Sequence, residues 1–363
     1  MKMRIPLSSI SLSDLEKQYV LTAIDGSMLS STGPCVAEFE KRIAEQVGVR
    51  YAVATATGSA ALELIVRAMD IGPGDEVIVP AFTFASPALA VALAGAIPVF
   101  ADIDPETWTI DPARVAKLKT ARTRAVIAVD VLGHPCDYDA LGQIGLPIIE
   151  DAAEAHGATF KGRSVGSFGV GAIFSFQANK AISSGEGGCV VTDDLKLARR
   201  VRKINTFGMD PDRRYWHTEL GGNYRMTNLV AAVALGQIER WSELLKGRAR
   251  VAALYDKAIG NLPVQRRPVA PWAGEAVWLY TIASERRRDI LTACAHSGID
   301  ARALWPSLPE NPVFQKYNRG DCPNAQRIAN QALWLPTWSD MPESDVEEVS
   351  TAVKGVFQTQ PMP

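Results

Sequence analysis

The segment AIFSFQANKAISSGEGGCVVT, residues 172–192, joins two short β-rich runs through a glycine-rich turn. Ala172–Phe176 and Gly188–Thr192 have the length and the β-branched and aromatic content of strands. Lys180 follows the first run and precedes the turn. A lysine after a strand is usually a surface residue, but a lysine that attacks a carbonyl needs a sheltered site, where desolvation favours the neutral amine. The neighbouring motifs decide between these two interpretations.

Short β-rich runs alternate with helix-length segments from about residue 50 to residue 195. This alternation is typical of a largely parallel sheet with helices on both faces, so the sequence predicts an α/β fold. The predicted strands are Tyr51–Ala54, Glu76–Val79, Ile97–Ala101, Ala125–Val129, Pro147–Glu150, Ala172–Phe176 and Gly188–Thr192.

A change of domain is predicted near residue 245, at the end of a helix-length segment, Asn228–Leu245. Residues 1–245 would form the large domain and residues 246–363 a smaller one. Within the second part, Val277–Ile282, Arg288–Ser297 and Asp345–Phe357 indicate an α+β arrangement.

The composition excludes several classes of protein. The 363 residues carry 38 Lys and Arg against 40 Asp and Glu, and a net charge of −2 gives no general attraction to nucleic acid or to an anionic membrane. The five cysteines form no CxxC pair, so neither a disulfide scaffold nor a metal site is indicated. No apolar run approaches the ~18 residues of a membrane span, and the sequence predicts a cytoplasmic protein.

Asp151 ends the run LPIIED, residues 146–151. Open α/β sheets bind ligands at the carboxyl ends of their strands, so a carboxylate at this position is a candidate for catalysis. Capping of the segment that follows is an equally good interpretation of this motif taken alone.

The residues Thr57-Gly58-Ser59 open a segment with apolar residues at helical spacing. A helix N-terminus here would offer amide N–H groups, a hydroxyl and the positive end of the helix dipole to a phosphate. Simple capping by Thr57 or Ser59 explains the motif as well, and the two interpretations do not exclude each other.

Three motifs together are similar to the DegT/DnrJ/StrS family of sugar aminotransferases. They are EDAAEAHG (residues 150–157), KGRSVGSFG (residues 161–169) and the segment around Lys180. The similarity begins at Ile5 and continues past Asn228, over at least two-thirds of the chain. It implies a fold-type I enzyme that uses pyridoxal 5'-phosphate (PLP), with a mostly parallel seven-stranded sheet in the large domain.

The resemblance assigns residues to the cofactor ring. Lys180 would bond covalently to PLP and move protons, and Asp151 would pair with the pyridine nitrogen. Phe84 matches the aromatic residue that stacks on the ring, and Glu154 would lie beside it.

The resemblance also assigns residues to the cofactor phosphate. Gly58, Ser59 and Ser175 match the phosphate-binding positions. Asn223 matches a residue that reaches the phosphate from the neighbouring subunit, which implies a homodimer with shared active sites.

The substrate is implied by finer similarities. RRYWH (residues 213–217) and NYRMTN (residues 223–228) look most like the perosamine synthases of the family, which aminate a GDP-linked 4-keto-6-deoxy sugar with L-glutamate as donor. Ser31, His217 and Arg302 are the candidate substrate-binding residues, although a structural role for His217 is as plausible. Met28 and the segment after Arg302, which lacks the Pro-Leu-His element of many relatives, leave the nucleotide and the sugar open.

Three alternatives differ from this interpretation in cofactor, activity or substrate. A nicotinamide-dependent enzyme is disfavoured because no GxGxxG motif follows the first strand. A PLP-binding protein without activity and an aminotransferase that acts on another keto sugar or a cyclitol both remain compatible with the sequence.

Overall fold

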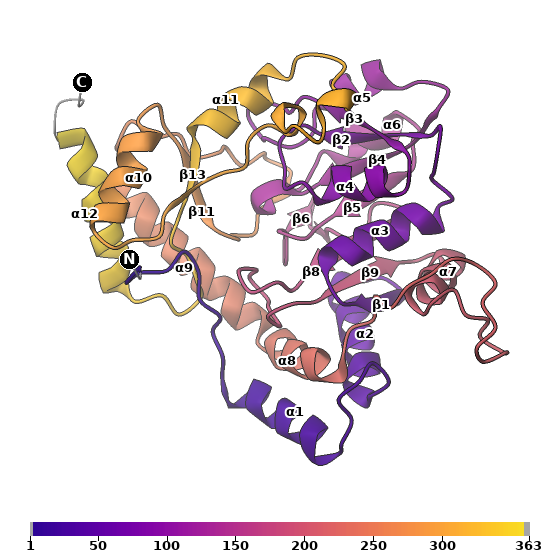
Figure 1. Ribbon diagram of the computed structural model, residues 1–363. Coiled ribbons are helices and arrows are strands. Elements are labelled where there is room, and N and C mark those ends of the chain that lie inside the picture. The colour runs from indigo at the N-terminus through magenta and orange to yellow at the C-terminus, as the bar shows by residue number, and fades with distance from the viewer. Residues whose placement is uncertain (1–2, 359–363) are drawn as a thin grey trace.

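A computed structural model describes residues 3–358 of the chain, and its centre is a seven-stranded sheet (Figure 1). The strand order is β1–β9–β8–β5–β4–β2–β3. The strands are β1 (Tyr51–Thr55), β2 (Glu76–Pro80), β3 (Ile97–Ala101), β4 (Thr123–Val129), β5 (Ile148–Asp151), β8 (Gly171–Ser175) and β9 (Gly188–Thr192).

The mostly parallel α/β sheet predicted from the sequence is confirmed. Only β9 runs against its neighbours: it pairs antiparallel with β1 and with β8, whereas the other neighbouring strands pair in parallel. All seven predicted runs form strands, with ends that differ by at most two residues. The carboxyl ends of the six parallel strands therefore lie along one edge of the sheet.

Successive residues of each strand enter different cores because strand side chains alternate between the two faces. In β4, Ile127 and Val129 belong to one hydrophobic cluster, and Val126 and Ala128 belong to the other. Helices α3, α4 and α7 complete the first cluster, and α2, α5, α6 and α8 complete the second. The predicted helical layers on both faces are therefore present, as Figure 1 shows for α3 and α2.

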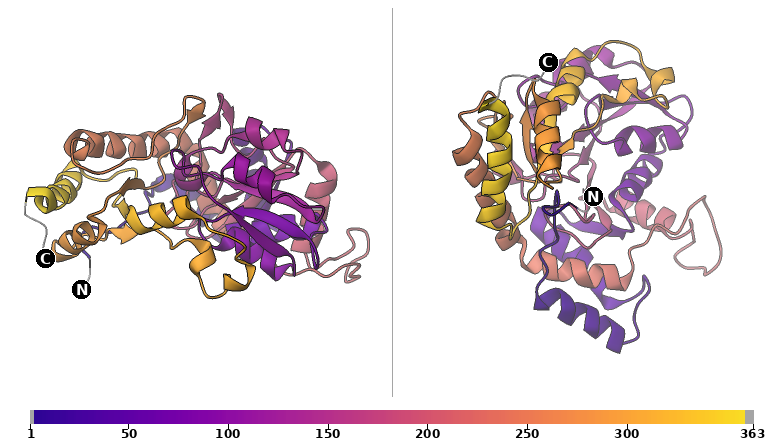
Figure 2. Two further views of the ribbon diagram at one scale, coloured as in Figure 1. Left: turned by 90° about the horizontal axis from the view of Figure 1, so that it is seen from above. Right: turned by 60° about the vertical axis from the view of Figure 1, so that its left-hand side comes forward.

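The helices of this part have the bounds α1 (Asp14–Asp25), α2 (Pro34–Val47), α3 (Gly58–Ala68), α4 (Ser86–Leu93), α5 (Pro112–Leu118), α6 (Tyr138–Gln143), α7 (Leu195–Asn205) and α8 (Asn228–Glu239), with a 3-10 turn η1 (Val131–Gly133). A small antiparallel sheet is formed by β6 (Thr159–Phe160), β7 (Arg163–Ser164) and β10 (Ala273–Gly274). The segment between α7 and α8 projects from the side of the molecule (Figures 1 and 2).

The helix predicted over Asn228–Leu245 is wrong in its extent. This segment contains α8 and the first residues of a second helix, α9 (Trp241–Ile259), with Arg240 between the two helices. The Arg240 side chain donates hydrogen bonds to Glu16 and to the Ser11 carbonyl, both 3.1 Å away, and these tertiary contacts fix the break. Since α9 runs unbroken through residue 245, the structure shows no linker there, and the domain boundary stays a prediction.

The C-terminal part is the predicted smaller α+β unit. Its sheet has the order β11–β13–β12, and Ile282, Leu333 and Leu335 pack with α9, α10 and α12 in a third core. The elements are β11 (Tyr280–Ala283), α10 (Arg287–His296), β12 (Arg302–Ala303), η2 (Leu308–Glu310), η3 (Gln315–Tyr317), α11 (Pro323–Gln331), β13 (Ala332–Leu335) and α12 (Glu343–Gln358). Figure 2 shows α10 and α12, in orange and yellow, at the opposite end from the large sheet.

One C-terminal segment returns to the large sheet. Leu304, Leu308 and Phe314 belong to the same hydrophobic cluster as Val79 of β2 and Phe100 of β3. Glu76, which is fully buried, pairs with Arg319 at 2.8 Å and also with Arg122. These ion pairs lie at the amino end of β2, whereas the Leu308 amide donates to the carbonyl of Ala81, the residue after β2, at 2.8 Å and so holds this segment at the edge where the parallel strands end.

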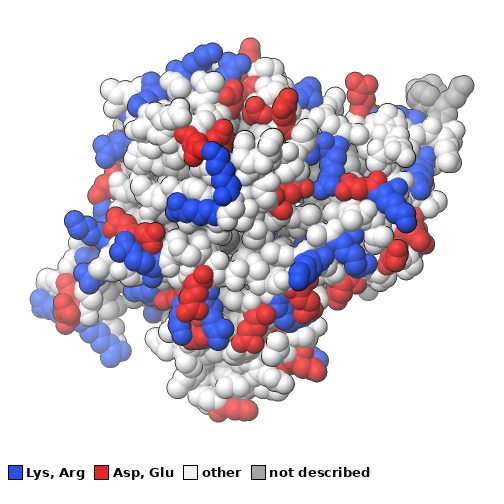
Figure 3. All heavy atoms as spheres, turned by 180° about the vertical axis from the view of Figure 1, so that it is seen from behind, with Lys and Arg blue, Asp and Glu red and all other residues white. Residues whose placement is uncertain are grey.

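The surface carries both charges. On the face seen in Figure 3, Lys and Arg side chains alternate with Asp and Glu. Within residues 3–358, no helix is long and apolar enough to cross a membrane, and no cluster of three or more His, Cys, Asp and Glu could hold a metal ion.

Candidate active site

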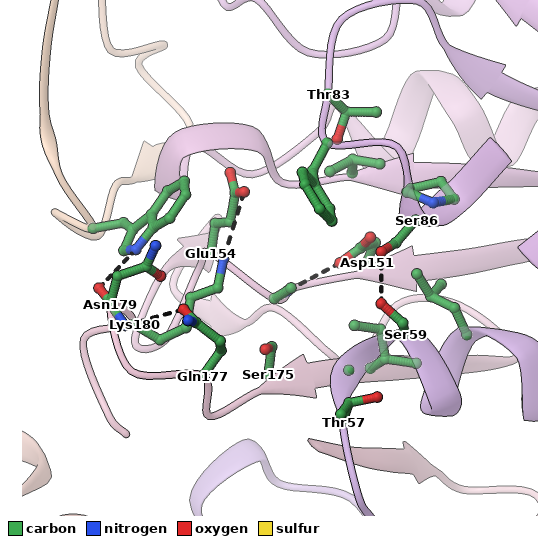
Figure 4. Close-up of a pocket in the computed structure, with 18 of the residues that line it drawn as sticks. Thr57, Ser59, Thr83, Ser86, Asp151, Glu154, Ser175, Gln177, Asn179 and Lys180 are labelled. Carbon is green, nitrogen blue, oxygen red and sulfur yellow. Dashed lines mark hydrogen bonds and ion pairs between the residues drawn. The ribbon is translucent and has the colours of Figure 1, made fainter. Parts of the chain in front are cut away.

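A cavity of about 410 Å³ opens at the carboxyl ends of the parallel strands. The loops after β1, β2 and β8 and the end of β5 contribute Gly58, Phe84, Asp151 and Lys180, and the C-terminal part contributes three tryptophans. The position agrees with the general rule that open α/β sheets bind ligands at this edge. Figure 4 shows the polar residues from the different loops turned toward a common space.

The N-terminus of α3 faces this cavity. The Thr57 hydroxyl accepts the amide of Ala60 at 3.1 Å and caps the helix, while the amides of Gly58 and Ser59 donate to no acceptor among residues 3–358. A Cβ atom at position 58 would lie 2.8 Å from the Ser175 Cβ, so only glycine lets the turn approach the end of β8. The result is a ready site for an anion, with the Ser59 and Ser175 hydroxyls beside it.

Asp151 stands at the end of β5 and is 5% exposed. One oxygen accepts the amide of Ala153 at 3.1 Å. Burial raises the pKa of Asp151 to about 7, and Glu154 raises it further, whereas the Ala153 amide and the charge of Lys180 oppose the shift. Capping and catalysis, the two interpretations of the sequence, are therefore both compatible with this carboxylate, which keeps its second oxygen for a cavity ligand.

Glu154 is buried between the cavity and the turn η1. It accepts the amide of Leu132 at 2.8 Å, and Leu132 has a φ of 57°, a conformation that non-glycine residues adopt only at a cost. Burial raises the pKa of Glu154 and Lys180 opposes that shift. The carboxylate thus links the backbone under the cavity to the lysine.

Lys180 is one of the sheltered side chains of the cavity, with 11% of its side chain exposed. Its Nζ lies 3.6 Å from Glu154 and 3.8 Å from the centre of the Trp278 ring. Burial lowers the pKa of Lys180, although the carboxylates of Glu154 and Asp151 counteract part of this shift. The alternative of a surface lysine is therefore wrong, and burial shifts the amine toward its neutral form relative to a lysine in water.

Three tryptophans form what we call the tryptophan wall: Trp278, Trp305 and Trp334. The rings of Trp278 and Trp305 are stacked at 6.2 Å, and Trp334 meets both edge-on at 5.3 and 5.0 Å. Phe84 is 54% exposed and lies 6.4 Å from Trp305, so the cavity mouth offers a broad aromatic surface.

Four residues predicted for the site lie outside the cavity of their own chain. Ser31 and Arg302 do not line it, and Arg302 instead pairs with Asp300 at 2.7 Å. His217 binds the Phe207 carbonyl at 2.9 Å, and Asn223 accepts a hydrogen bond from Arg225 at 2.9 Å. Their predicted roles stay predictions, and for Asn223 the predicted site was that of a neighbouring subunit.

Comparison with known proteins decides the family. The model of the DegT/DnrJ/EryC1/StrS aminotransferase family matches residues 11–354. The GDP-perosamine synthase of Caulobacter vibrioides is 39% identical over 365 residues, which cover 98% of each chain. The chain belongs to this aminotransferase family. The recognition made from the sequence motifs is confirmed.

Solved structures agree in fold. Streptomyces DesV, described as S. venezuelae DesV in complex with a ketimine intermediate, has a TM-score of 0.92 and 32% identity, covering 99% of this chain and 100% of that chain. The PLP form of Spr1654 from Streptococcus pneumoniae, a sugar aminotransferase by its description, has a TM-score of 0.92 at 25% identity, covering 98% of each chain. The fold-type I aminotransferase architecture and the PLP cofactor are thereby confirmed.

The cavity of this family member fits PLP in three respects. The free amides at the α3 N-terminus suit its phosphate, Asp151 suits a protonated pyridine nitrogen, and the sheltered amine of Lys180 suits its aldehyde. The sequence motifs identified each of these groups.

Other cavity residues were missed by the sequence analysis. The tryptophan wall, Thr83, Ser86, Gln177 and Asn179 all line the cavity. Gln177 and Asn179 come just before Lys180 in the sequence, so their closeness to the site could have been predicted, but the tryptophans carry no local motif. Ser86 binds Ser59 at 2.7 Å and thereby holds the α3 turn against α4 (Figure 4).

Proposed function

We propose that this aminotransferase transfers the amino group of L-glutamate to the keto group of a nucleotide-linked 4-keto-6-deoxy sugar, with a GDP-linked, perosamine-type substrate. The observation that carries the proposal is the sheltered Lys180 amine, 3.6 Å from Glu154 and in one cavity with Asp151 and the α3 N-terminus. The substrate class is supported by the 39% identity to a GDP-perosamine synthase over nearly the whole length of both chains.

Asp151, Lys180 and the α3 N-terminus each have a defined task in this reaction. PLP, when bound, accepts the electron pair released as the substrate C–H bond breaks. Asp151 holds a positive charge on the ring nitrogen, and the α3 N-terminus holds the phosphate. Lys180 takes the proton from the glutamate α-carbon at its Nζ and later delivers a proton to the sugar carbon. Because Lys180 reaches the sugar from one side only, the new amine has a single configuration.

We also propose a homodimer in which each active site uses residues of both subunits. Among residues 3–358, Lys180 is the one basic residue that lines the cavity, whereas a nucleotide diphosphate needs cations around it. The projecting segment between α7 and α8 contains Arg213, Arg214, His217 and Asn223, which lie away from the cavity of their own chain. Exposed Leu220 and Trp216 on the same segment support contact with a second copy.

The substrate proposal is tested with a panel of keto sugars. GDP-, UDP- and dTDP-linked 4-keto-6-deoxy sugars and a 3-keto nucleotide sugar are each incubated with the enzyme, PLP and L-glutamate. The 2-oxoglutarate and the amino sugar are then measured. We expect the highest kcat/KM for the GDP-linked 4-keto sugar. Amination of non-nucleotide ketones alone would refute the substrate class and leave the cofactor assignment intact.

Shared active sites are tested by mixing two inactive variants. Lys180→Ala and Asn223→Ala subunits are combined under conditions that allow exchange. If the sites are shared, a mixed dimer has one site with both residues intact and regains part of the activity. Mixtures that stay inactive, although mixed dimers are detected by mass, would contradict the arrangement.

A further inference from the structure

Arg248 occupies a position of α9 at which the helical pattern places apolar residues. The buried face of α9 consists of Trp241, Leu244, Arg248, Val251, Ala252, Tyr255 and Ile259. Arg248 is only 2% exposed, and burial lowers the pKa of its guanidinium to about 9. Among residues 3–358, no carboxylate forms an ion pair with it. A buried cation without a counter-charge is costly, so the carbonyl groups that accept its hydrogen bonds must stabilise it.

The guanidinium donates to the backbone on both sides of the cavity lysine. One nitrogen, Nη2, donates to the Lys180 carbonyl at 3.0 Å and to the Asn179 carbonyl at 3.3 Å. The other, Nη1, donates to the Trp278 carbonyl and to the Thr337 carbonyl, the latter at 3.3 Å. The planar fork of an arginine, with five N–H donors, can reach carbonyls of several segments at once.

The same segments are joined a second time at the tryptophan wall. The Trp278 indole Nε1 donates to the Asn179 carbonyl at 2.9 Å, and its ring lies under the Lys180 Nζ. The Asn179 carbonyl therefore has two donors, one from α9 and one from the wall. Between them, the turn that carries Lys180 cannot move away from Trp278 without breaking both bonds.

Arg248 also acts on Lys180 through its charge. Both groups are cationic when protonated, and Arg248 adds to the burial that lowers the pKa of Lys180. The ionisable groups that interact with Lys180 are Glu154 and Asp151, which oppose the shift, Arg248, which supports it, and His156, whose own pKa is lowered by burial and by the charge of Lys180.

We propose that Arg248 is a positioning residue that holds the Asn179–Lys180 backbone against the Trp278 backbone and so aims the Lys180 amine between Glu154 and the indole ring. The inference rests on the proposal that Lys180 carries the cofactor, and it is independent of which keto sugar is the substrate. Its two main readouts therefore use the full-length chain after removal of PLP and without substrate, and turnover of the PLP-loaded enzyme is an additional readout.

The main variant is Arg248→Met, which fits the apolar pattern of α9. Trace labelling of Lys180 with acetic anhydride across a pH series reports the titration of its amine. We expect the midpoint to rise by about one pH unit, since a nearby cation is lost and the turn loosens. Hydrogen exchange of amides 177–182 should quicken by about tenfold. In the PLP-loaded enzyme, kcat should fall by at least tenfold with little change in KM.

Arg250→Met is the matched control. Arg250 lies on the same helix, is exposed, and donates to the Met341 carbonyl at 2.6 Å, away from the cavity. This variant should match the wild type in labelling midpoint and in exchange. If Arg248→Met behaves like Arg250→Met in both readouts, Arg248 does not position the lysine and the proposal is refuted.

Arg248→Lys covers the case in which the methionine variant does not fold. A lysine keeps the cation but reaches fewer carbonyls, so its labelling midpoint and its hydrogen exchange should lie between those of the wild type and of Arg248→Met. If Arg248→Met does not fold, both values should still differ from those of the wild type. A lysine variant equal to wild type in exchange and in kcat would show that charge alone suffices, which overturns the positioning role.

Discussion

The two sides of the cavity come from different parts of the chain. The polar cluster, formed by Gly58, Ser59, Asp151, Glu154 and Lys180, comes from the ends of three strands. The tryptophan wall comes from residues 278–334, beyond the last strand of the large sheet. The cluster is polar and held by backbone hydrogen bonds, whereas the wall is apolar and held by ring contacts, with one indole hydrogen bond from Trp278 to the Asn179 carbonyl. The comparison suggests that the cluster performs the chemistry and the wall shapes what enters.

Loss of the lysine should have the largest effect. In Lys180→Ala, no amine remains to bond PLP or to move protons, so kcat should fall by at least about 10³-fold. PLP should still bind without a covalent bond, because the α3 N-terminus is unchanged. Stopped-flow turnover and borohydride reduction, which fixes PLP only on an amine, check both points. Lys161→Ala, at an exposed lysine paired with Asp139, should behave as wild type. Comparable turnover in the two variants would show that the cluster does not perform the chemistry.

A methyl group at the N-terminus of α3 should have the second largest effect and weaken cofactor binding. In Gly58→Ala, the new Cβ would lie 2.8 Å from the Ser175 Cβ and would push the turn away from β8. We expect the PLP affinity to fall by about 30-fold, equivalent to ~2 kcal/mol. Gly142→Ala is the matched control, because a Cβ there meets no atom within 4 Å. Fluorescence titration with PLP measures both, and equal affinities would mean that the phosphate binds elsewhere.

The sequence predicted the cluster because each of its members ends a strand or lies within five residues after one. Seven β-rich runs gave the sheet, and a parallel sheet brings the residues after its strands to one edge. Ser59 and Asp151 could thus be placed together although they lie far apart in the chain. The family motifs then separated the buried Lys180 from an ordinary surface lysine.

The wall and the α9 residues could not be predicted in this way. Trp305 faces the cavity because Leu304 and Leu308 pack into the core under β2, a contact between distant segments with no local pattern. The break at Arg240 depends on contacts with Glu16 and Ser11, and no glycine or proline marks it. Arg248 is a charged residue on a buried face, where periodicity alone predicts the wrong residue type.

Ionisation of the cluster should appear in the stability of the PLP-free protein. Burial raises the pKa of Asp151 from 3.8 to about 7, so between these values the folded state keeps a proton that the unfolded state releases. The free energy of unfolding contributed by this group therefore falls as the pH rises through that window. Asp151→Asn lacks this loss. The difference in the free energy of unfolding between the variant and the wild type should therefore increase by on the order of 2 kcal/mol from pH 5 to pH 8.

Urea unfolding of the PLP-free chains at pH 5 and pH 8 measures this difference. Asp139→Asn, at an exposed carboxylate, is the control and should follow the wild type at both pH values. A constant difference between Asp151→Asn and wild type across the two pH values would show that Asp151 is ionised throughout. The cluster would then be less shielded from water than its burial indicates.

Removal of one ring from the wall should have the smallest effect and the most informative one. Trp305 is half-buried, contacts Trp278, Trp334 and Phe84, and makes no hydrogen bond to the polar cluster in the described chain. If the wall shapes the substrate space, Trp305→Ala should raise the KM of the keto sugar by about 10-fold, or ~1.4 kcal/mol, and leave PLP affinity unchanged. Trp305→Phe should restore most of the loss, because it keeps an aromatic face. The reverse result, with normal KM and weakened PLP binding, would assign the wall to the cofactor and remove the division between the two sides. Steady-state kinetics together with PLP titration separates these outcomes, and a melting curve for each variant shows whether the ring cluster itself has collapsed.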